Sequence, residues 1–192
     1  MLNKDHWRNP RTAIATKFEN NDYGYMFHAG VLYQEFLNAC NLSSSELKTK
    51  SILDYGCGTG RVTRFLALAS KYAVGYDPTV ECIIESKIEG QKIEAVNKQP
   101  ALLTSDFSKI TNKFDIVVCI NVLEHLHGID YDIAIRNIID SLNEGGMAYL
   151  WIPKTTSLPI KDIEKYKNAP GRLLIVRGQK INGAITIFEN CI

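Results

Sequence analysis

The strongest constraint on the fold of this chain is a glycine-rich turn that joins a short apolar run to a helical pattern. Residues 51–55 (Ser-Ile-Leu-Asp-Tyr) predict a buried strand, and the turn Gly-Cys-Gly-Thr-Gly follows at residues 56–60. The next apolar residues repeat on one helical face: Val62, Phe65, Leu66 and Ala69. Backbone can approach a ligand closely in such a turn, and the helix that follows offers its first N–H groups. The turn therefore predicts a site for a nucleotide-type ligand in an α/β sheet.

The rest of the chain continues this alternation of strands and helices. Further strands are expected at residues 72–76, 101–104, 114–120 and 147–152. One-sided apolar patterns predict helices from about residue 27 (Ala29, Leu32, Tyr33, Phe36, Cys40), after Thr79 (Val80, Ile83, Ile84, Ile88) and at residues 130–142 (Ile135, Ile138, Ile139, Leu142), the last ending at Glu144, Gly145 and Gly146. Apolar strands between helices indicate a doubly wound parallel sheet that is covered on both faces.

The C-terminal part of the chain has a different pattern. Apolar and β-branched residues fill residues 173–176 and 184–188, and a loop with Gly178, Asn182 and Gly183 joins them. This pattern predicts an antiparallel β-hairpin at an edge of the sheet. The short stretch before the hairpin leaves room for one short helix and for no separate substrate domain. The expected organisation is an N-terminal arm and helix at residues 1–45, a candidate lid, followed by a ligand-binding domain at residues 46–192.

Composition limits the class of protein. The 192 residues, 45% of them hydrophobic and 22% charged, suffice for one globular core. A net charge of +1 gives no overall attraction to nucleic acid, and no apolar run approaches the roughly 20 residues of a membrane span. The five cysteines lack metal-ligand spacing, and the first residues lack the apolar core of a signal peptide. We therefore expect a cytoplasmic protein with free thiols, with no metal and no membrane partner, as a monomer or homodimer.

Two cofactor classes compete for a turn of this kind. The dinucleotide fingerprint requires G-x-G-x-x-G, but Arg61 stands where the third glycine is required. The spacing is instead G-x-G-x-G, with Asp54 before the turn. Asp77 ends the second expected strand, where an acid accepts the ribose hydroxyls of a bound cofactor. A plain strand–helix connection is the alternative for the turn alone, and the position of Asp77 makes that alternative the weaker one.

Residues 52–61 resemble the first motif of the class I S-adenosylmethionine-dependent methyltransferases. The similarity runs from about residue 50 to residue 152, through further segments at residues 75–78, 104–107, 114–126 and 142–146. The fourth motif, which ends here in Glu-His-Leu, has a form that is common in the small-molecule branch of this family. The resemblance implies a Rossmann-like sheet of seven strands with a C-terminal antiparallel hairpin. It also implies a cofactor at the carboxyl ends of strands one, two and four.

The same resemblance implies a site that binds S-adenosylmethionine and releases S-adenosylhomocysteine. In that site Asp54 orients the ammonium group of the cofactor, and Asp77 accepts both ribose hydroxyls. Asp106 and Phe107 hold the adenine. The other expected cofactor contacts lie around the glycine turn, the second strand and the fourth strand: Gly56, Cys57, Gly58, Gly60, Pro78, Ile120 and Asn121.

His125 is the candidate catalytic residue, because it follows the fourth expected strand, where this fold places the acceptor. An imidazole with a pKa of about 6.5 suits a general base at neutral pH. A solvent-facing or helix-packing histidine is the alternative. Glu124 is a candidate substrate contact, and its alternative role is an acid at a helix N-terminus, where the helix dipole favours negative charge.

Three residues near the N-terminus are further candidate substrate contacts. Tyr23, Tyr25 and His28, together with Phe27, precede the expected first helix. This region often closes over the cofactor in the family that the chain resembles. The alternative is that these side chains anchor the N-terminal arm to the core.

The predicted function is methyl transfer to the oxygen or nitrogen of a small-molecule acceptor. The methyl group of a sulfonium cofactor is already activated, so the protein mainly needs to align the acceptor with it. No Pro-Pro-aromatic segment follows the fourth strand, and Val118 rather than proline precedes Cys119, so methylation of DNA bases is disfavoured. Two alternatives stay open: a tRNA or protein methyltransferase, and a non-catalytic S-adenosylmethionine-binding partner subunit.

Overall fold

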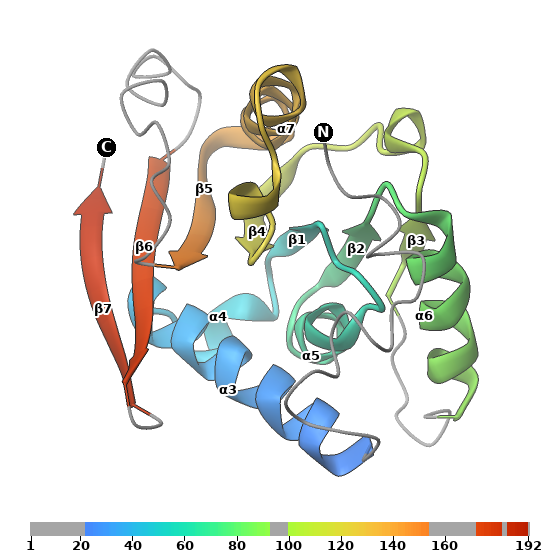
Figure 1. The fold of residues 1–192 in the computed structure, drawn as a ribbon, viewed down its shortest axis with the longest axis horizontal. Helices are drawn as coiled ribbons and strands as arrows, with labels where there is room; N and C mark the ends of the chain where they lie inside the picture. The colour runs from blue at the N-terminus through green and yellow to red at the C-terminus, as the bar shows by residue number, and fades with distance from the viewer. Residues whose placement is uncertain (1–21, 93–99, 154–171, 182–183, 192) are drawn as a thin grey trace. The chain divides into compact units, whose positions relative to one another are not determined.

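The structure is a computed structural model that describes residues 22–92, 100–153, 172–181 and 184–191 (Figure 1). The chain divides into two compact units, one within residues 3–111 and the other within residues 112–192. Each unit contains strands that pair in parallel, and helices connect β1 to β2, β2 to β3 and β4 to β5. The predicted α/β class with a parallel sheet is therefore confirmed.

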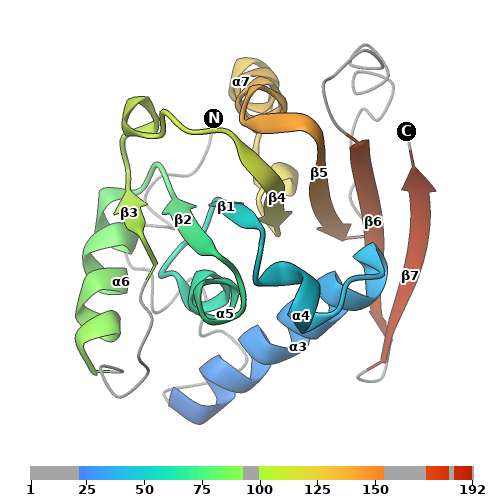
Figure 2. The same cartoon turned by 180° about the vertical axis from the view of Figure 1, so that it is seen from behind.

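The unit at residues 3–111 alternates helices and strands. Its elements are α3 (Asp22–Cys40), α4 (Ser44–Leu47), β1 (Ser51–Tyr55), α5 (Arg61–Ala69), β2 (Tyr72–Tyr76), α6 (Val80–Lys92), β3 (Leu102–Thr104) and the 3-10 helix η1 (Phe107–Lys109). β2 pairs in parallel with β1 and with β3. α5 contacts β1 and β2, α6 lies beside β3, and α3 packs against α5 (Figures 1 and 2). This arrangement brings the carboxyl ends of β1, β2 and β3 to one edge of the unit.

The unit at residues 112–192 is built around four strands in its described residues. Its elements are β4 (Phe114–Ile120), the 3-10 helix η2 (Leu123–His125), α7 (Ile129–Asp140), β5 (Leu142–Pro153), β6 (Arg172–Ile181) and β7 (Ala184–Cys191). β5 pairs in parallel with β4 and β6, and β6 pairs antiparallel with β7. The connecting residues 182–183 lie outside the described residues. A single sheet of seven strands stays a prediction, as does the turn of its hairpin.

Three strands begin and end at the predicted residues: β1, β2 and β4. Each is a short apolar run with polar or glycine residues at its ends, and such a run belongs in a sheet that is covered on both faces. Every residue of β1 is buried, and so is the middle of β4 from Ile116 to Cys119. No helix among the described residues combines the length and the hydropathy that crossing a bilayer requires.

The predicted start of the first helix is wrong. Tyr23, Tyr25 and His28 do not precede α3 but belong to its first two turns, because the helix begins at Asp22. Gly24 and the aromatic residues have low helix propensity, which hid this part of the helix in the sequence. An acid at the first position suits the helix dipole. The predicted buried face further along α3 is confirmed for Ala29, Leu32, Phe36 and Cys40.

The predicted buried face of α6 is also wrong in part. Val80, Ile84 and Ile88 are exposed, whereas Cys82, Ile83 and Ser86 are buried. The prediction placed Ile84 and Ile88 on the buried face because of their hydrophobicity alone. The helix instead turns Ser86 inward, because the guanidinium group of Arg64 on α5 donates hydrogen bonds to Ser86. The buried face of this helix thus combines the apolar residues Cys82 and Ile83 with a hydrogen-bonded serine.

The last predicted helix ends too late. α7 stops at Asp140, and Leu142 already pairs with Phe114 as the first residue of β5. The register then shifts, so that Met147 pairs with Ile116. Gly146 lies in this irregular segment, and a Cβ there would lie 2.9 Å from the carbonyl oxygen of Asn143. The two glycines therefore form an irregularity within a strand, rather than the end of a helix.

Candidate functional site

Backbone hydrogen bonds hold the glycine-rich turn against the end of β2. The N–H groups of Gly56 and Cys57 donate to the carbonyl oxygen of Tyr76 over 2.7 and 2.9 Å. The N–H of Gly60 donates to the carbonyl oxygen of Cys57 over 2.9 Å. Gly56, Gly58 and Gly60 all have positive φ, the region that side chains disfavour. We call residues 56–60 the glycine loop. It is a closed turn at the carboxyl ends of β1 and β2.

Asp77 connects the glycine loop to the start of α6. Its Oδ2 accepts a hydrogen bond from the N–H of Gly58, and its Oδ1 accepts one from the N–H of Thr79, each over 2.9 Å. Burial raises the pKa of Asp77, and these two hydrogen bonds lower it. Each carboxylate oxygen can accept a second hydrogen bond. Binding of ribose hydroxyls by Asp77 therefore stays a prediction that this geometry permits.

Helix α5 begins at the glycine loop without a side-chain cap. Gly60 occupies the N-cap position with φ +74° and ψ +19°, and the first turn carries no acid. The N-terminus of an α-helix has about half a unit of positive charge, which favours carboxylates and phosphates. The start of α5 therefore suits the carboxylate of an amino-acid-like ligand.

Three aromatic rings gather next to the glycine loop. The ring centroids of Tyr55 and Tyr76 lie 5.0 Å apart, and Phe107 lies 5.9 Å from Tyr55 and 5.1 Å from Tyr76. The angles of Phe107 to the two tyrosines, 68° and 74°, are those of edge-to-face contacts. Phe107 was predicted from the sequence, but Tyr55 and Tyr76 were missed. Their shared position as the last residue of a strand was the available signal.

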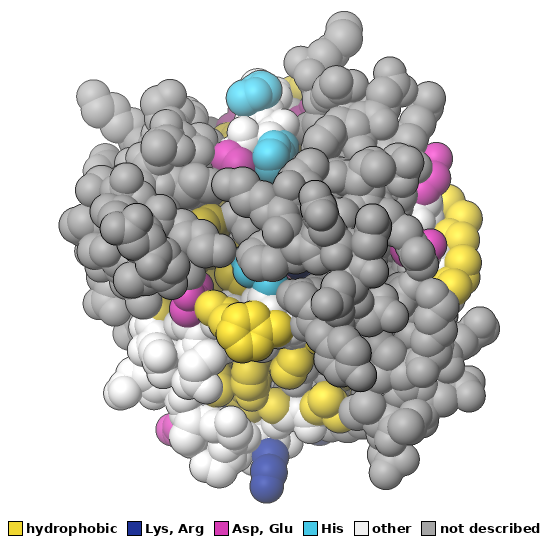
Figure 3. Space-filling view, turned by 60° about the horizontal axis from the view of Figure 1, so that its bottom comes forward, with side chains coloured by type: hydrophobic (Ala, Val, Ile, Leu, Met, Phe, Trp, Pro, Cys, Tyr) yellow, Lys and Arg dark blue, Asp and Glu magenta, His cyan; other side chains and the backbone are white. Residues whose placement is uncertain are grey.

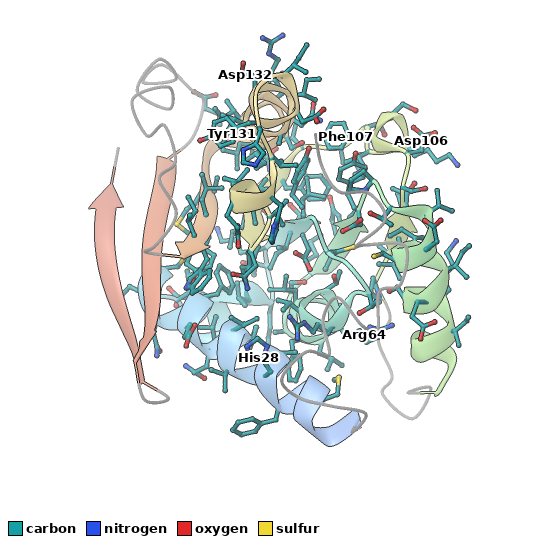
Figure 4. The ribbon with its side chains drawn as sticks, in the orientation of Figure 1. His28, Arg64, Asp106, Phe107, Tyr131 and Asp132 are labelled. Atoms are coloured by element: carbon teal, nitrogen blue, oxygen red, sulfur yellow. The ribbon has the colours of Figure 1, made fainter. Side chains whose placement is uncertain are left out.

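Asp106 has a local structural role. Its Oδ1 accepts hydrogen bonds from the N–H and the hydroxyl of Ser108, over 3.1 and 2.6 Å, so it caps η1. The bond from the Ser108 side chain lowers the pKa of Asp106. The carboxylate is exposed beside Phe107 (Figure 4). Recognition of an adenine amino group by Asp106 stays a prediction. Pro78, another predicted contact, is exposed.

Two predicted cofactor contacts have buried side chains. Asp54 is 4% exposed, and the hydroxyl of Thr63 donates to its Oδ2 over 2.5 Å. The pKa of Asp54 is raised to about 7, mainly by burial and also by the neighbouring Asp77, while the hydrogen bond from Thr63 lowers it. The thiol of Cys57 is also buried, which raises its pKa well above the usual value. Their predicted roles at the cofactor are not tested by these contacts.

The buried Asp54 makes stability depend on pH. Its pKa is about 7 in the folded protein and ordinarily 3.8, so the folded state holds a proton that the unfolded state has lost between these values. Stability from this group is fully present below pH 3.8 and is lost as pH rises through about 7. Between pH 5 and pH 8 the ionisation of Asp54 should lower the free energy of unfolding of the wild type by about 2–3 kcal/mol. We expect Asp54→Asn, which keeps an acceptor for Thr63, to lack this decrease. Urea unfolding of both proteins at each pH measures it; equal pH dependence would contradict the burial of an ionisable Asp54.

In the unit at residues 112–192, two predicted contacts end β4. Ile120 is half-buried. Asn121 adopts a φ of +56°, and its N–H donates to the carbonyl oxygen of Trp151 on β5 over 3.3 Å. Asparagine adopts this conformation more readily than most residues other than glycine, so the positive φ assigns no function by itself. The predicted role of Asn121 stays a prediction.

The candidate catalytic residues follow on η2. The side chain of His125 is 44% exposed and that of Glu124 is 10% exposed, with 3.9 Å between Nε2 of His125 and Oε1 of Glu124. Burial raises the pKa of Glu124 to about 7. Among the described residues, no hydrogen-bond partner reaches Oε2 of Glu124. An accessible imidazole thus stands beside a largely buried carboxyl group. These residues and the glycine loop belong to different units, and a common site stays a prediction.

The N-terminal candidates lie on α3. The side chains of Tyr23 and Tyr25 lie outside the described residues, and His28 is half-buried (Figure 4). Phe27 is 74% exposed, and hydrophobic side chains gather on the face in Figure 3 where α3 comes forward. A lid function for this helix stays a prediction.

Arg64 is a buried residue near the glycine loop that was not predicted from the sequence. It lies four residues after Gly60, the last residue of the glycine loop, is 5% exposed, and leaves α5 on the side of α6 (Figure 4). A charged side chain within an amphipathic helix is normally placed on the solvent face. Across the described part of the chain, no group of three His, Cys, Asp or Glu side chains is arranged to hold a metal ion.

The family of the chain follows from a comparison with family models. The model of a methyltransferase domain matches residues 28–182, which is most of the chain. The chain therefore belongs to this methyltransferase domain family.

Two curated relatives match about half of the chain. The magnesium-protoporphyrin O-methyltransferase of Synechocystis sp. is 28% identical over 109 residues, which are 57% of this chain and 47% of that protein. The tRNA U34 carboxymethyltransferase of Campylobacter fetus is 30% identical over 105 residues, which are 54% of this chain and 36% of that protein. The chain spans less than half the length of these curated relatives.

A solved structure has the same fold over almost the whole chain. The magnesium protoporphyrin IX methyltransferase from Synechocystis, in a crystal structure with bound SAM, superposes with a TM-score of 0.65 and 20% identity. The match covers 97% of this chain and 89% of that one. This match confirms the Rossmann-like methyltransferase fold that was predicted from the sequence.

Proposed function

We propose that this chain is an S-adenosylmethionine-dependent methyltransferase whose glycine loop and Asp77 bind the cofactor. The observation that carries the proposal is the hydrogen bond from the loop to Asp77, at the carboxyl ends of β1 and β2. Ligands bind at the carboxyl ends of strands in open α/β sheets. Membership of the methyltransferase domain family and the SAM in the structure from Synechocystis support it.

The described residues fit such a cofactor. The second lone pairs of the Asp77 carboxylate can accept ribose hydroxyls. Phe107 is half-buried and packs edge-to-face on the buried rings of Tyr55 and Tyr76, so we propose that it contacts the adenine. The uncapped start of α5 suits the carboxylate of the methionine portion. When bound, the cofactor supplies a methyl group that the positive sulfonium has already activated.

The acceptor that we propose is the oxygen or nitrogen of a small molecule. The magnesium-protoporphyrin O-methyltransferase among the relatives supports this class of acceptor, and the net charge of +1 gives no general attraction to polyanions. His125 takes the acceptor proton, and Glu124 contacts the acceptor beside it. The five cysteines are odd in number and widely spread along the chain, which supports a reducing, cytoplasmic location. A monomer or homodimer is the proposed assembly.

A tRNA substrate is the second candidate. The relative from Campylobacter fetus, a tRNA U34 carboxymethyltransferase, favours it. A non-catalytic subunit that binds the cofactor is the third reading, and it predicts binding without transfer to any acceptor.

Calorimetry and thermal melts with S-adenosylmethionine and S-adenosylhomocysteine test the cofactor. We expect both to bind, and ligand at about 100 times its Kd to stabilise the fold by about 2.7 kcal/mol. NAD serves as a control that should not bind. Absence of heat and of stabilisation at millimolar ligand would contradict the proposed function.

Transfer of a radiolabelled methyl group to a panel of acceptors tests the substrate class. The panel contains magnesium protoporphyrin, small phenols, small amines and bulk tRNA. Label on a small molecule supports the first candidate, and label on tRNA supports the second. Tight binding without any transfer supports the non-catalytic subunit.

A further inference from the structure

Arg64 joins the glycine loop to helix α6. Its Nη1 donates to the carbonyl oxygen of Thr59 in the loop over 2.8 Å. Its Nη2 donates to the carbonyl oxygen of Ser86 on α6, and it lies 3.5 Å from the hydroxyl of Ser86. The two ends of one guanidinium group therefore hold the loop and the helix together.

The surroundings of this side chain are buried and closely packed. Arg64 is 5% exposed, and Ser86 and Thr59 are buried as well. A Cβ on Gly60 would clash with the hydroxyl of Ser86 and would lie 3.3 Å from Nη1 of Arg64. Gly60 thus leaves the space in which the guanidinium reaches both carbonyl groups.

The link complements the one that Asp77 makes. Asp77 joins Gly58 to Thr79 at the start of α6, and Arg64 joins Thr59 to Ser86 in the middle of the same helix. Two adjacent loop residues are therefore tied to one helix, one by a carboxylate and the other by a guanidinium. Hydrogen bonds that involve a charged group are stronger than neutral ones, and the planar fork of arginine fixes their direction.

We propose that Arg64 is a positioning residue, which fixes the glycine loop to α6 in the conformation that binds the cofactor. The proposal rests on the proposed function, because it assigns the bound cofactor to this loop. Arg64 itself does not contact the cofactor in this proposal. It acts through the Thr59 carbonyl, which sets the path of the loop between Gly58 and Gly60.

Three substitutions test the role of Arg64. Arg64→Met fills the space without hydrogen bonds, and Arg64→Lys keeps the charge but lacks the fork that reaches two carbonyls. Arg136→Met, at an exposed arginine of α7, is the matched control. We expect the Kd for S-adenosylmethionine to rise at least about tenfold in Arg64→Met and by a smaller factor in Arg64→Lys, with no change in the control.

Amide hydrogen exchange supplies a readout that needs no cofactor. Exchange at Gly58 and Gly60 should accelerate in both Arg64 variants, at a temperature where circular dichroism shows them folded, while amides of β4 keep their rates. If Arg64→Met does not fold, Arg64→Lys carries the test. A folded variant with wild-type affinity and wild-type loop exchange would overturn the proposal. If the wild type binds no S-adenosylmethionine, the proposed function fails, and faster loop exchange in the variants would still show the Arg64 link.

Discussion

Replacing Asp77 with alanine is expected to weaken S-adenosylmethionine binding by a factor of about 100 or more. Each hydrogen bond from a ribose hydroxyl to a carboxylate contributes about 1.5–3 kcal/mol, and about 1.4 kcal/mol corresponds to a factor of ten. The substitution also removes the partners of the Gly58 and Thr79 amides, which orient the glycine loop. The loss of affinity thus combines a lost contact with a less ordered loop. Calorimetry with S-adenosylmethionine measures the affinity, and thermal melts measure the stability.

A second variant separates the two effects of Asp77. Asp77→Asn keeps one acceptor oxygen, but its amide nitrogen cannot accept a hydrogen bond. One backbone amide and one ribose hydroxyl then lose their acceptor, so we expect an affinity between those of the wild type and the alanine variant. Asp130→Ala, at an exposed acid of α7, is the control and should bind normally. An Asp77→Ala protein with near wild-type affinity would remove Asp77 from the cofactor site.

Replacing His125 with alanine is expected to lower the turnover number by a factor of about 100 to 10,000, the usual contribution of a general base. Its imidazole is accessible, and the Glu124 carboxyl group lies 3.9 Å away, where a carboxylate stabilises the charge of the protonated ring. The affinity for S-adenosylmethionine should stay nearly unchanged, because His125 acts on the acceptor. Methyl-transfer kinetics with an acceptor found in the panel measure the turnover number.

Glu124→Gln is the matched comparison for His125. Burial raises the pKa of Glu124 to about 7, so its carboxylate forms only as pH rises through that value. In the wild type the turnover should therefore rise through neutral pH, and in Glu124→Gln this rise should be smaller. Near-normal turnover in His125→Ala, together with a large loss in Glu124→Gln, would transfer the role of base to Glu124.

Strand positions were the most predictable part of the fold. β1, β2 and β4 consist mostly of apolar residues. A strand that is covered on both faces can be recognised from such a run alone, without knowledge of its partner strand. The glycine loop and Asp77 could also be located, because their positions at strand ends follow from the alternation of elements. Local patterns were sufficient for these features.

The orientation of α6 and the contact between Tyr55 and Tyr76 could not be predicted, because they depend on residues that are far apart in the chain. Ser86 faces inward because Arg64, 22 residues earlier, donates hydrogen bonds to it. No periodicity within α6 shows this, since the isoleucines at positions 84 and 88 favour the opposite face. Tyr55 and Tyr76 were missed for the same reason, because their contact depends on the pairing of β1 with β2.

The pair of links from the loop to α6 also bears on the transfer of this motif between proteins. The seven residues from Asp54 to Gly60 form the signature by which this chain resembles the class I methyltransferases. In this chain an arginine in the following helix links them by hydrogen bonds to a carbonyl group of the helix after that. A chimaera that carries the signature alone would lack both anchors of its loop, Asp77 and Arg64. The smallest segment to graft onto another scaffold is therefore residues 51–92, which includes β1, α5, β2 and α6.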